Sequence, residues 1–323
     1  MTTKRNQIAI GVLAYNEEVY LQSVLEQLEK LNLDIYIVND CSTDSTGIIL
    51  SKFEDNKNIS IINNKKNFGA GESTKILIEY AKNNSKDFLI KVDGDGQFSI
   101  SDVEKIIDLY INKNYEFIKS NRFWREGIVG KIPKIRFFGN IFATLLMQVA
   151  SGTNKLYDPL NGLFGVSTNI LNALNTRFYP KRYGYPYFIT VAAVLHNFKT
   201  FQINNVVSYR DEKSNLNSIK VFFTLLKLTI LFYLNKLKSK KIEAKLQRSA
   251  FFDYLFIFSF GLLLNTLIYF ILITFILEKS FIRSSNLLLV IIFLFVTTIY
   301  FFSKAFNEEI KFRNSLIKIE TIN

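Results

Sequence analysis

The stretch Phe88-Leu89-Ile90-Lys91-Val92-Asp93-Gly94-Asp95-Gly96-Gln97 decides the fold and indicates the chemistry. Its apolar run Phe88–Val92 is typical of a buried strand, and the carboxylates of Asp93 and Asp95 follow directly. Because strand side chains alternate, residues two apart can point the same way and place two oxygen ligands close together. Such a pair suits Mg²⁺ or Mn²⁺ bridging a diphosphate. Asp and Gly also form ordinary turns, so the motif alone leaves both interpretations open.

Outward from this strand, short apolar runs alternate with amphipathic helical stretches. The expected strands are Ile8–Leu13, Ile35–Val38, Ile59–Ile62 and Phe88–Val92. The helical stretches that follow them are Glu17–Lys30, Ser45–Phe53, Gly71–Lys82 and Ser101–Ile111. This alternation predicts βαβ units, and therefore an α/β fold with a mostly parallel sheet. After Phe117–Ser120 the alternation is less regular, and an apolar helix-like stretch covers Phe137–Val149.

Polar loops follow each of these four strands. Ligands of such sheets bind beyond the carboxyl ends of the strands, so we expect the four loops to line one crevice. The loops are Ala14–Glu18, Asn39–Ser45, Asn64–Gly71 and Asp93–Gln97. Asp44 or Ser45 can also cap the next helix, and both roles can coexist. The third loop lacks the complete glycine spacing of phosphate loops and dinucleotide folds, which argues against an ATPase or a Rossmann dehydrogenase.

Two long apolar stretches, Tyr254–Leu277 and Leu287–Phe302, lie toward the end of the chain. A helix of about 20 mostly apolar residues crosses a bilayer, so the two stretches predict a transmembrane hairpin. Lysine and arginine gather before the first stretch and after the second, which predicts that both chain ends and the large domain are cytoplasmic. Ser218–Leu237 predicts a helix at the membrane interface, with a third span as the alternative. Ile8–Leu13 is too short for a secretory signal.

Composition excludes several classes of function. The 323-residue chain carries a formal net charge of +12, but its positive residues crowd ahead of the first apolar stretch. They do not form a basic groove with stacking aromatics, which argues against a nucleic-acid partner. The single cysteine, Cys41, excludes an internal disulfide and a cysteine zinc cluster. The single histidine, His196, lies in an apolar run where a core or surface role is the simpler interpretation, so a histidine-dependent triad is disfavoured.

Six motifs occur in an order that resembles one enzyme family. They are Ala14–Glu18, Val38–Thr46, Asn67–Gly71, Val92–Gln97, Ser120–Phe123 and Asp158–Gly162. In this order they closely resemble the family 2 glycosyltransferases with the GT-A fold, specifically the polyprenyl-phosphate sugar transferases similar to dolichyl-phosphate mannose synthase. The resemblance covers about residues 6–215, and the two apolar stretches match the bacterial membrane-anchored branch.

The resemblance implies a domain organisation. A GT-A (Rossmann-like) nucleotide-sugar-binding domain would occupy residues 1–215, followed by amphipathic juxtamembrane helices over 216–250. Two transmembrane helices would cover 251–303, and a cytoplasmic tail 304–323. The expected location is the cell membrane, with several spans and the catalytic domain in the cytoplasm.

The resemblance also assigns site residues. The donor nucleotide sugar would be contacted by Tyr15, Glu17, Asp40, Asp93 and Gln97. Asp95 would bind the metal, Arg122 would stand near the transferred group, and Asp158 would face the reacting centre. The acceptor phosphate would be met by Arg136, Arg210 and Lys213.

These residues predict an inverting transfer of sugar from a UDP- or GDP-linked donor to a polyprenyl phosphate. The metal, Mg²⁺ or Mn²⁺, and nearby cations would neutralise the diphosphate leaving group. A lipid phosphate is already a nucleophile at neutral pH, since its second pKa lies near about 6, so no strong base is required. One alternative is a membrane glycan polymerase of the same superfamily, and another is a non-catalytic nucleotide-sugar-binding membrane protein. The sequence leaves self-association into a homo-oligomer open.

Overall fold

The computed structural model describes residues 2–123, 128–129, 134–174, 177–205, 207–208, 218–272 and 281–319. Contacts divide the chain into two compact units. The first unit comprises residues 1–151, 155–232 and 316–323, and the second comprises 152–154 and 233–315. Each unit is described by itself.

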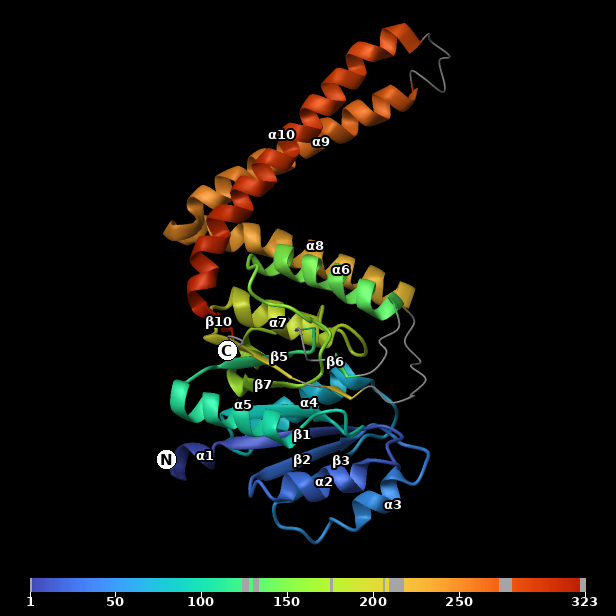
Figure 1. Cartoon of the computed structure of the whole chain (residues 1–323), viewed down its shortest axis with the longest axis vertical. Helices are drawn as coiled ribbons and strands as arrows, with labels where there is room; N and C mark the ends of the chain where they lie inside the picture. The colour runs from blue at the N-terminus through green and yellow to red at the C-terminus, as the bar shows by residue number, and fades with distance from the viewer. Residues whose placement is uncertain are drawn as a thin grey trace. The chain divides into compact units, whose positions relative to one another are not determined.

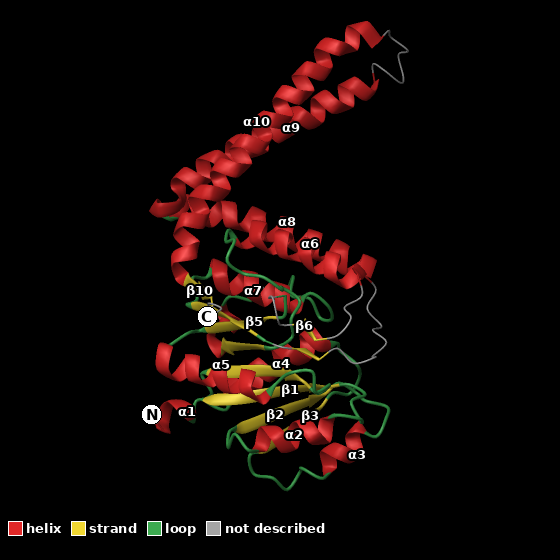
Figure 2. Ribbon diagram, in the orientation of Figure 1, coloured by secondary structure: helices red, strands yellow, loops and turns green. Residues whose placement is uncertain are grey.

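An eight-stranded sheet forms the centre of the first unit (Figures 1 and 2). In spatial order its strands are β10 (Ile317–Ile319), β8 (Thr200–Asn204), β5 (Phe117–Asn121), β7 (Phe164–Ser167), β4 (Phe88–Asp93), β1 (Ile8–Ala14), β2 (Asp34–Asn39) and β3 (Ile59–Asn63). Only β7 runs antiparallel to its neighbours β4 and β5, and the other pairs in this sheet are parallel. The expected α/β fold with a mostly parallel sheet is therefore confirmed. Two short strands, β6 (Ile128–Val129) and β9 (Val207–Ser208), pair separately.

Helices cover both faces of this sheet because each strand buries side chains alternately on either side. One core packs the sheet against α2 (Leu21–Glu29), α3 (Thr46–Ser51) and α5 (Ile100–Lys113). The other core packs it against α4 (Ala70–Asn83), α6 (Lys134–Ser151), α7 (Tyr185–Leu195) and the first half of α8 (Ser218–Ile242). The remaining elements of this unit are the short helices α1 (Thr2–Arg5) and η1 (Thr168–Asn172).

The expected alternation in the first part of the chain is confirmed, with the ends of elements shifted by a few residues. Helix α2 begins at Leu21 instead of Glu17, because Asn16 has a left-handed φ of 58° and a turn precedes the helix. The second half is less regular because β7 enters the sheet antiparallel between β4 and β5. Near the end of the chain, β10 extends the sheet from β8, so Leu316–Ile319 belongs to the first unit.

The second unit is helical. Helices α9 (Gln247–Ile271) and α10 (Phe281–Arg313) lie side by side, with the short helices η2 (Ala244–Leu246) and η4 (Asn314–Leu316) at their ends (Figure 1). Two of the described helices are long and apolar enough to cross a membrane, Gln247–Ile271 and Leu287–Leu316. Only 11% and 6% of their most apolar windows are buried, in contrast to the core helices of soluble proteins, which are mostly buried. Residues 273–280, which include the expected end of the first span, lie outside the described residues.

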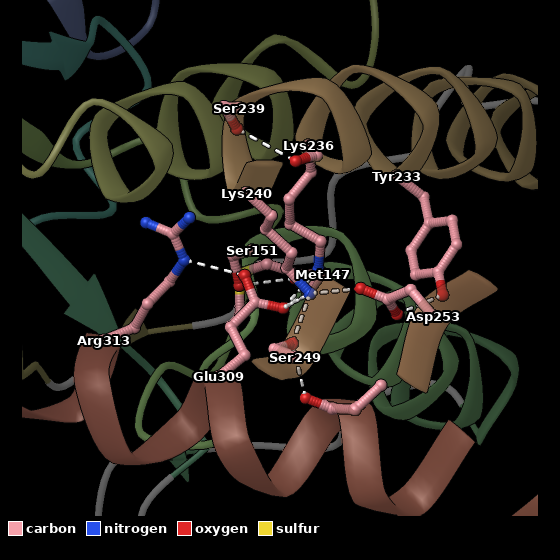
Figure 3. A network of polar contacts seen from close by, with 11 residues as sticks. Met147, Ser151, Tyr233, Lys236, Ser239, Lys240, Ser249, Asp253, Glu309 and Arg313 are labelled. Atoms are coloured by element: carbon pink, nitrogen blue, oxygen red, sulfur yellow. Dashed lines mark hydrogen bonds and ion pairs between the residues drawn. The ribbon is translucent and has the colours of Figure 1, made fainter. Parts of the chain in front are cut away.

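A buried charged network joins the helices of the second unit (Figure 3). Its centre is Glu309 of α10, whose Oε2 lies 2.9 Å from Lys236 Nζ and 2.7 Å from Lys240 Nζ. Its other oxygen, Oε1, accepts a 2.8 Å hydrogen bond from Arg313 Nε. All four side chains are only 1–2% exposed.

The network continues from α8 to α9. Lys240 Nζ pairs with Asp253 Oδ2 at 2.7 Å and donates to Ser249 Oγ at 2.9 Å. Tyr233 donates its hydroxyl proton to Asp253 Oδ1 at 2.6 Å. Three helices are therefore held by charges that have neutralising or hydrogen-bonding partners, which is the condition under which buried charges are tolerated.

Candidate active site

A pocket opens at the carboxyl ends of β4 and β5, the edge at which the parallel strands were expected to present polar loops. It is lined by Asp93, Asp95, Gln97, Phe98, Arg122, Asn161, Gly162, Leu163 and Asn205. Four of the residues expected at the site, Asp93, Asp95, Gln97 and Arg122, are therefore brought together.

The end of β4 presents the two carboxylates differently. Asp93 Oδ1 lies 2.5 Å from Nζ of Lys91, which is fully buried, while the Asp93 side chain is 41% exposed. Asp95 Oδ1 accepts a 3.0 Å hydrogen bond from the backbone N–H of Gln97, which closes a tight turn. A Cβ on Gly162 would lie 2.2 Å from Asp93 Oδ2, so a larger residue at this position would force the Asp93 carboxylate to move.

Lys91 is charged despite its burial. Burial alone would lower the pKa of its ammonium, but the negative charge of Asp93 outweighs that effect, and the net result is a pKa above the ordinary value. Lys91 therefore stays protonated at neutral pH.

The end of β5 presents Arg122, which is held by Asp158. The Asp158 carboxylate is fully buried and accepts from Arg122 Nε at 2.8 Å, Arg122 Nη2 at 2.8 Å and the Arg122 backbone N–H at 2.9 Å. Burial alone would raise the pKa of this carboxyl, but the charge and hydrogen bonds of Arg122, together with the charge of Lys119, hold it below its ordinary value. Asp158 itself does not line the pocket, and it fixes the guanidinium that does.

Asn161 and Asn205 were missed as site residues, although Asn161 lies in a quoted motif. Asn161 Nδ2 is 3.2 Å from Asp158 Oδ2 and 3.2 Å from Asn205 Oδ1, and both asparagines are buried. They connect the Arg122–Asp158 pair to the end of β8.

The other three residues expected to contact the nucleotide, Tyr15, Glu17 and Asp40, lie on the loops after β1 and β2. Asp40 is 5% exposed, and its carboxylate accepts backbone N–H groups of Phe68 at 2.9 Å and Gly69 at 2.8 Å. It thereby fixes the loop before α4. Tyr15 is 47% exposed, and the backbone N–H of Glu17 donates to Thr46 Oγ1 at 2.8 Å. Asp44 Oδ1 accepts from the backbone N–H of Thr46, the first residue of α3, whereas Ser45 at the N-cap position makes no side-chain cap hydrogen bond.

Part of the expected site lies outside the described residues. These are the side chain of Arg136, and Arg210 and Lys213 in full. Their expected contact with an acceptor phosphate stays a prediction.

The carboxylates of Asp93 and Asp95 fit a divalent cation only if other groups supply further ligands. Within the described ranges no group of three or more His, Cys, Asp or Glu side chains could hold a metal ion. Asp93 and Asp95 supply hard oxygen ligands, which Mg²⁺ and Mn²⁺ prefer, and Mg²⁺ usually binds through one or two carboxylates plus substrate phosphates and water. The donor set therefore fits a cation that a bound diphosphate helps to hold.

Comparison with known proteins identifies the family. Residues 9–172 match the family model described as glycosyl transferase family 2. This match covers half of the chain, and the chain belongs to glycosyl transferase family 2. The expected recognition as a family 2 glycosyltransferase is thereby confirmed.

Two relatives are similar over part of the chain. A UDP-N-acetylglucosamine–dolichyl-phosphate N-acetylglucosaminyltransferase of Methanococcus voltae is 28% identical over 193 residues, 54% of this chain and 75% of the relative. An uncharacterized protein of Methanocaldococcus jannaschii is 31% identical over 140 residues, 42% of this chain and 59% of that protein. The match with the latter thus spans less than two thirds of its length.

A solved structure shares the fold. Glucosyl-3-phosphoglycerate synthase from Mycobacterium tuberculosis, crystallised with Mn²⁺, uridine diphosphate and glucosyl-3-phosphoglycerate, aligns with a TM-score of 0.50 and 18% identity. The alignment covers 69% of this chain and 79% of that one. The shared architecture is the GT-A fold expected from the sequence motifs.

Proposed function

We propose that the protein transfers a sugar, with inversion, from a nucleoside-diphosphate sugar to a polyprenyl phosphate at the cytoplasmic face of the cell membrane. The observation that carries the proposal is a short path from the pocket to an apolar surface. Arg122 Cζ lies 5.7 Å from the ring of Phe123, and that ring lies 5.9 Å from the ring of Phe137 on α6. A lipid whose phosphate sits at Arg122 could therefore extend along α6.

The apolar surface is formed by α6 and the first half of α8. Phe142 of α6 stacks on Phe222 of α8 with ring centroids 4.9 Å apart. Large apolar side chains on both helices are exposed, at 37–69%: Phe137, Phe138, Ile141, Phe142, Leu145, Ile219, Phe222, Phe223 and Ile230. Exposed apolar area of this extent is typical of a protein or membrane contact, and apolar helix faces of this kind lie in bilayer interfaces. It supports the interfacial role expected for Ser218–Leu237 and extends that role to α6.

The pocket supports direct displacement without a protein base. The Asp158 carboxylate is occupied by Arg122 and has a lowered pKa, which makes it a poor proton acceptor. An oxygen of the lipid phosphate would attack the anomeric carbon while the bond to the nucleotide diphosphate breaks and the diphosphate keeps the electron pair. Arg122 would stabilise the reacting phosphates, and Asp158 would position Arg122.

The same pocket would bind the metal ion and the nucleotide-sugar donor. Asp95, with Asp93 beside it, would hold Mg²⁺ or Mn²⁺, which supplies positive charge to the leaving diphosphate. We favour a UDP-linked donor, because the Methanococcus voltae relative is named for UDP-N-acetylglucosamine and dolichyl phosphate. Tyr15, Glu17, Asp40 and Gln97 would contact the donor.

The second unit would anchor the enzyme. Helices α9 and α10 would cross the bilayer as a hairpin with both ends in the cytoplasm, as the lysine and arginine distribution predicts. Fusing a topology reporter after Arg313 tests this arrangement, and an external location of the reporter would contradict it.

The test of function is incubation of the detergent-purified full chain with labelled nucleotide sugars and polyprenyl phosphate. We expect label in an extractable glycolipid carrying one sugar. Faster labelling of a water-soluble oligosaccharide, or a polymer in place of a single-sugar lipid, would overturn the proposal. Arg210→Ala should raise the KM for the lipid phosphate far more than the KM for the donor, since Arg210 is expected to meet the acceptor.

A further inference from the structure

Lys91 occupies an unusual position for a lysine. It is fully buried in the central strand β4, and its ammonium meets two groups on that face of the sheet. Asp93 Oδ1 lies 2.5 Å from Nζ, and the ring centroid of Tyr185 lies 5.4 Å from it. Asp93 is 41% exposed and lines the pocket. Lys91 therefore pairs from the protein interior with a carboxylate that a ligand in the pocket can also reach.

An ion pair of this kind does not require burial of the lysine. Lys86 and Asp34, at the opposite edge of the same sheet, also lie 2.5 Å apart, but their side chains are 13% and 38% exposed. Burying an ammonium costs folding free energy, and a buried ion pair often contributes no more stability than apolar residues would. Stability therefore does not explain the burial of Lys91, and we look for a role of its charge at the pocket.

A second buried lysine matches the first across the sheet. Phe164 of β7 is the register partner of Lys91 on one side and of Lys119 on the other. Lys119 is 1% exposed, and its charge acts on Asp158. Each buried lysine thus acts on one carboxylate of the site: Lys91 on Asp93, which lines the pocket, and Lys119 on Asp158, which fixes Arg122.

The charges of these side chains balance. The carboxylates of Asp93, Asp95 and Asp158 are matched by Arg122 and the two buried lysines. Without the lysines the same site would carry two excess negative charges. Such a site would attract a divalent cation by itself and repel a diphosphate.

We propose that Lys91 is a positioning residue that keeps Asp93 ion-paired in the free protein, so that the pocket takes up a divalent cation together with a nucleoside diphosphate and not before it. Only the identity of the diphosphate rests on the proposed function. The ammonium competes with the cation for Asp93, and the negative charge of the diphosphate restores the attraction. Cation and nucleotide should therefore bind with strong positive coupling.

The test measures binding to the full chain in detergent, with no sugar transfer involved. Titrations use Mn²⁺ alone, UDP alone, and UDP with Mn²⁺, on the wild type, Lys91→Met and Lys91→Arg. We expect Lys91→Met to bind Mn²⁺ alone at least about tenfold more tightly and UDP alone about tenfold more weakly, because one nearby positive charge is lost. Lys91→Arg keeps the charge and should stay within about threefold of the wild type in both titrations.

The matched control is Lys86→Met, which removes the lysine of the ion pair at the far edge of the sheet. It should leave both affinities unchanged. A purely structural role of Lys91 would weaken both ligands together, whereas the proposed role moves them in opposite directions. If Lys91→Met does not fold, Lys91→Gln removes the charge and keeps a hydrogen bond to Asp93.

Unchanged or weaker binding of Mn²⁺ alone by a folded, neutral Lys91 variant would overturn the inference. Failure of the wild type to make glycolipid would overturn the proposed function instead. The two failures are distinguishable, because the Mn²⁺ titration needs neither donor nor acceptor.

Discussion

The two units of the molecule bury lysines against carboxylates, but they use them differently. In the first unit, two pairs have a partner that reaches the pocket: Asp93 beside Lys91, and Arg122 beside Asp158. In the second unit, the pairs around Glu309 are enclosed, with every charged side chain 1–2% exposed. Open pairs can exchange a partner for a ligand, whereas enclosed pairs can only hold helices together. Substitutions in the first unit should therefore change chemistry, and those in the second should change stability.

The largest expected effect is in the enclosed network. Glu309→Gln removes the carboxylate that neutralises Lys236, Lys240 and Arg313, and breaking a buried pair in this way costs about 3–5 kcal/mol. Thermal unfolding in detergent measures the loss. The control is the adjacent Glu308→Gln, because Glu308 pairs with Lys311, whose side chain is 72% exposed. This surface pair should be worth less than about 1 kcal/mol. Equal effects of the two substitutions would contradict the comparison.

The next effect is on turnover. Asp95→Ala should lower the rate of sugar transfer by about 10²–10³, or about 2.7–4 kcal/mol, which is typical for loss of one electrostatic stabiliser of developing charge. The midpoint of unfolding should stay close to that of the wild type. Asp34→Ala, at the opposite edge of the sheet, serves as the control and should retain activity. Near wild-type rates in the presence of a chelator would refute the metal assignment.

A smaller loss is expected for Asp158→Asn, about 10–100-fold in turnover, because Arg122 loses the carboxylate that orients it. A double-mutant cycle distinguishes positioning from direct action. If Asp158 acts through Arg122, the double variant Arg122→Ala/Asp158→Asn should be no slower than Arg122→Ala alone. Additive losses would show that Asp158 acts independently.

The smallest effect is a pH dependence of stability. Burial lowers the pKa of Lys119 to about 8, with Asp158 opposing this change and Arg122 adding to it. The ordinary value is 10.5, so between about pH 8 and pH 10.5 the unfolded chain binds more protons than the folded one. The contribution of Lys119 to the free energy of unfolding therefore becomes more favourable as pH rises through this window. Urea unfolding measures the free energies of unfolding of the wild type and Lys119→Met. As pH rises through this window, the wild type should gain stability relative to Lys119→Met. A difference between the two that does not change with pH would contradict the lowered pKa.

Much of the fold could be predicted because local signals agreed with the tertiary arrangement. Strands β1 to β4 are short apolar runs bounded by polar loops, and the parallel sheet follows from their alternation with helices. The position of β7 could not be predicted, because a four-residue strand carries no sign of its direction or neighbours. The same holds for β10, whose three residues join the sheet only through tertiary contact with β8.

The candidate site was predicted where motifs mark strand ends and missed where partners are distant in sequence. Asp93, Asp95, Gln97 and Arg122 line one pocket, whereas the loops after β1, β2 and β3, which were expected to line the same crevice, contribute no residue to it. Asp158 and Arg122 are 36 positions apart in the sequence, and nothing in the sequence around either residue predicts that they form an ion pair. Lys91 and Lys119 did leave a signal, since each directly follows apolar residues of a strand, Ile90 in β4 and Ile118 in β5. A charged residue within a fully buried strand deserves a search for its partner.

The most direct test of the account is the initial rate of glycolipid formation by the full chain, measured for wild type, Asp95→Ala and Glu309→Gln at a temperature at which all three are folded. The account predicts a lipid product from the wild type, a loss of about 10²–10³ in Asp95→Ala and a rate within about threefold of wild type in Glu309→Gln. No glycolipid from the wild type, or a loss in Glu309→Gln as large as in Asp95→Ala, would contradict it.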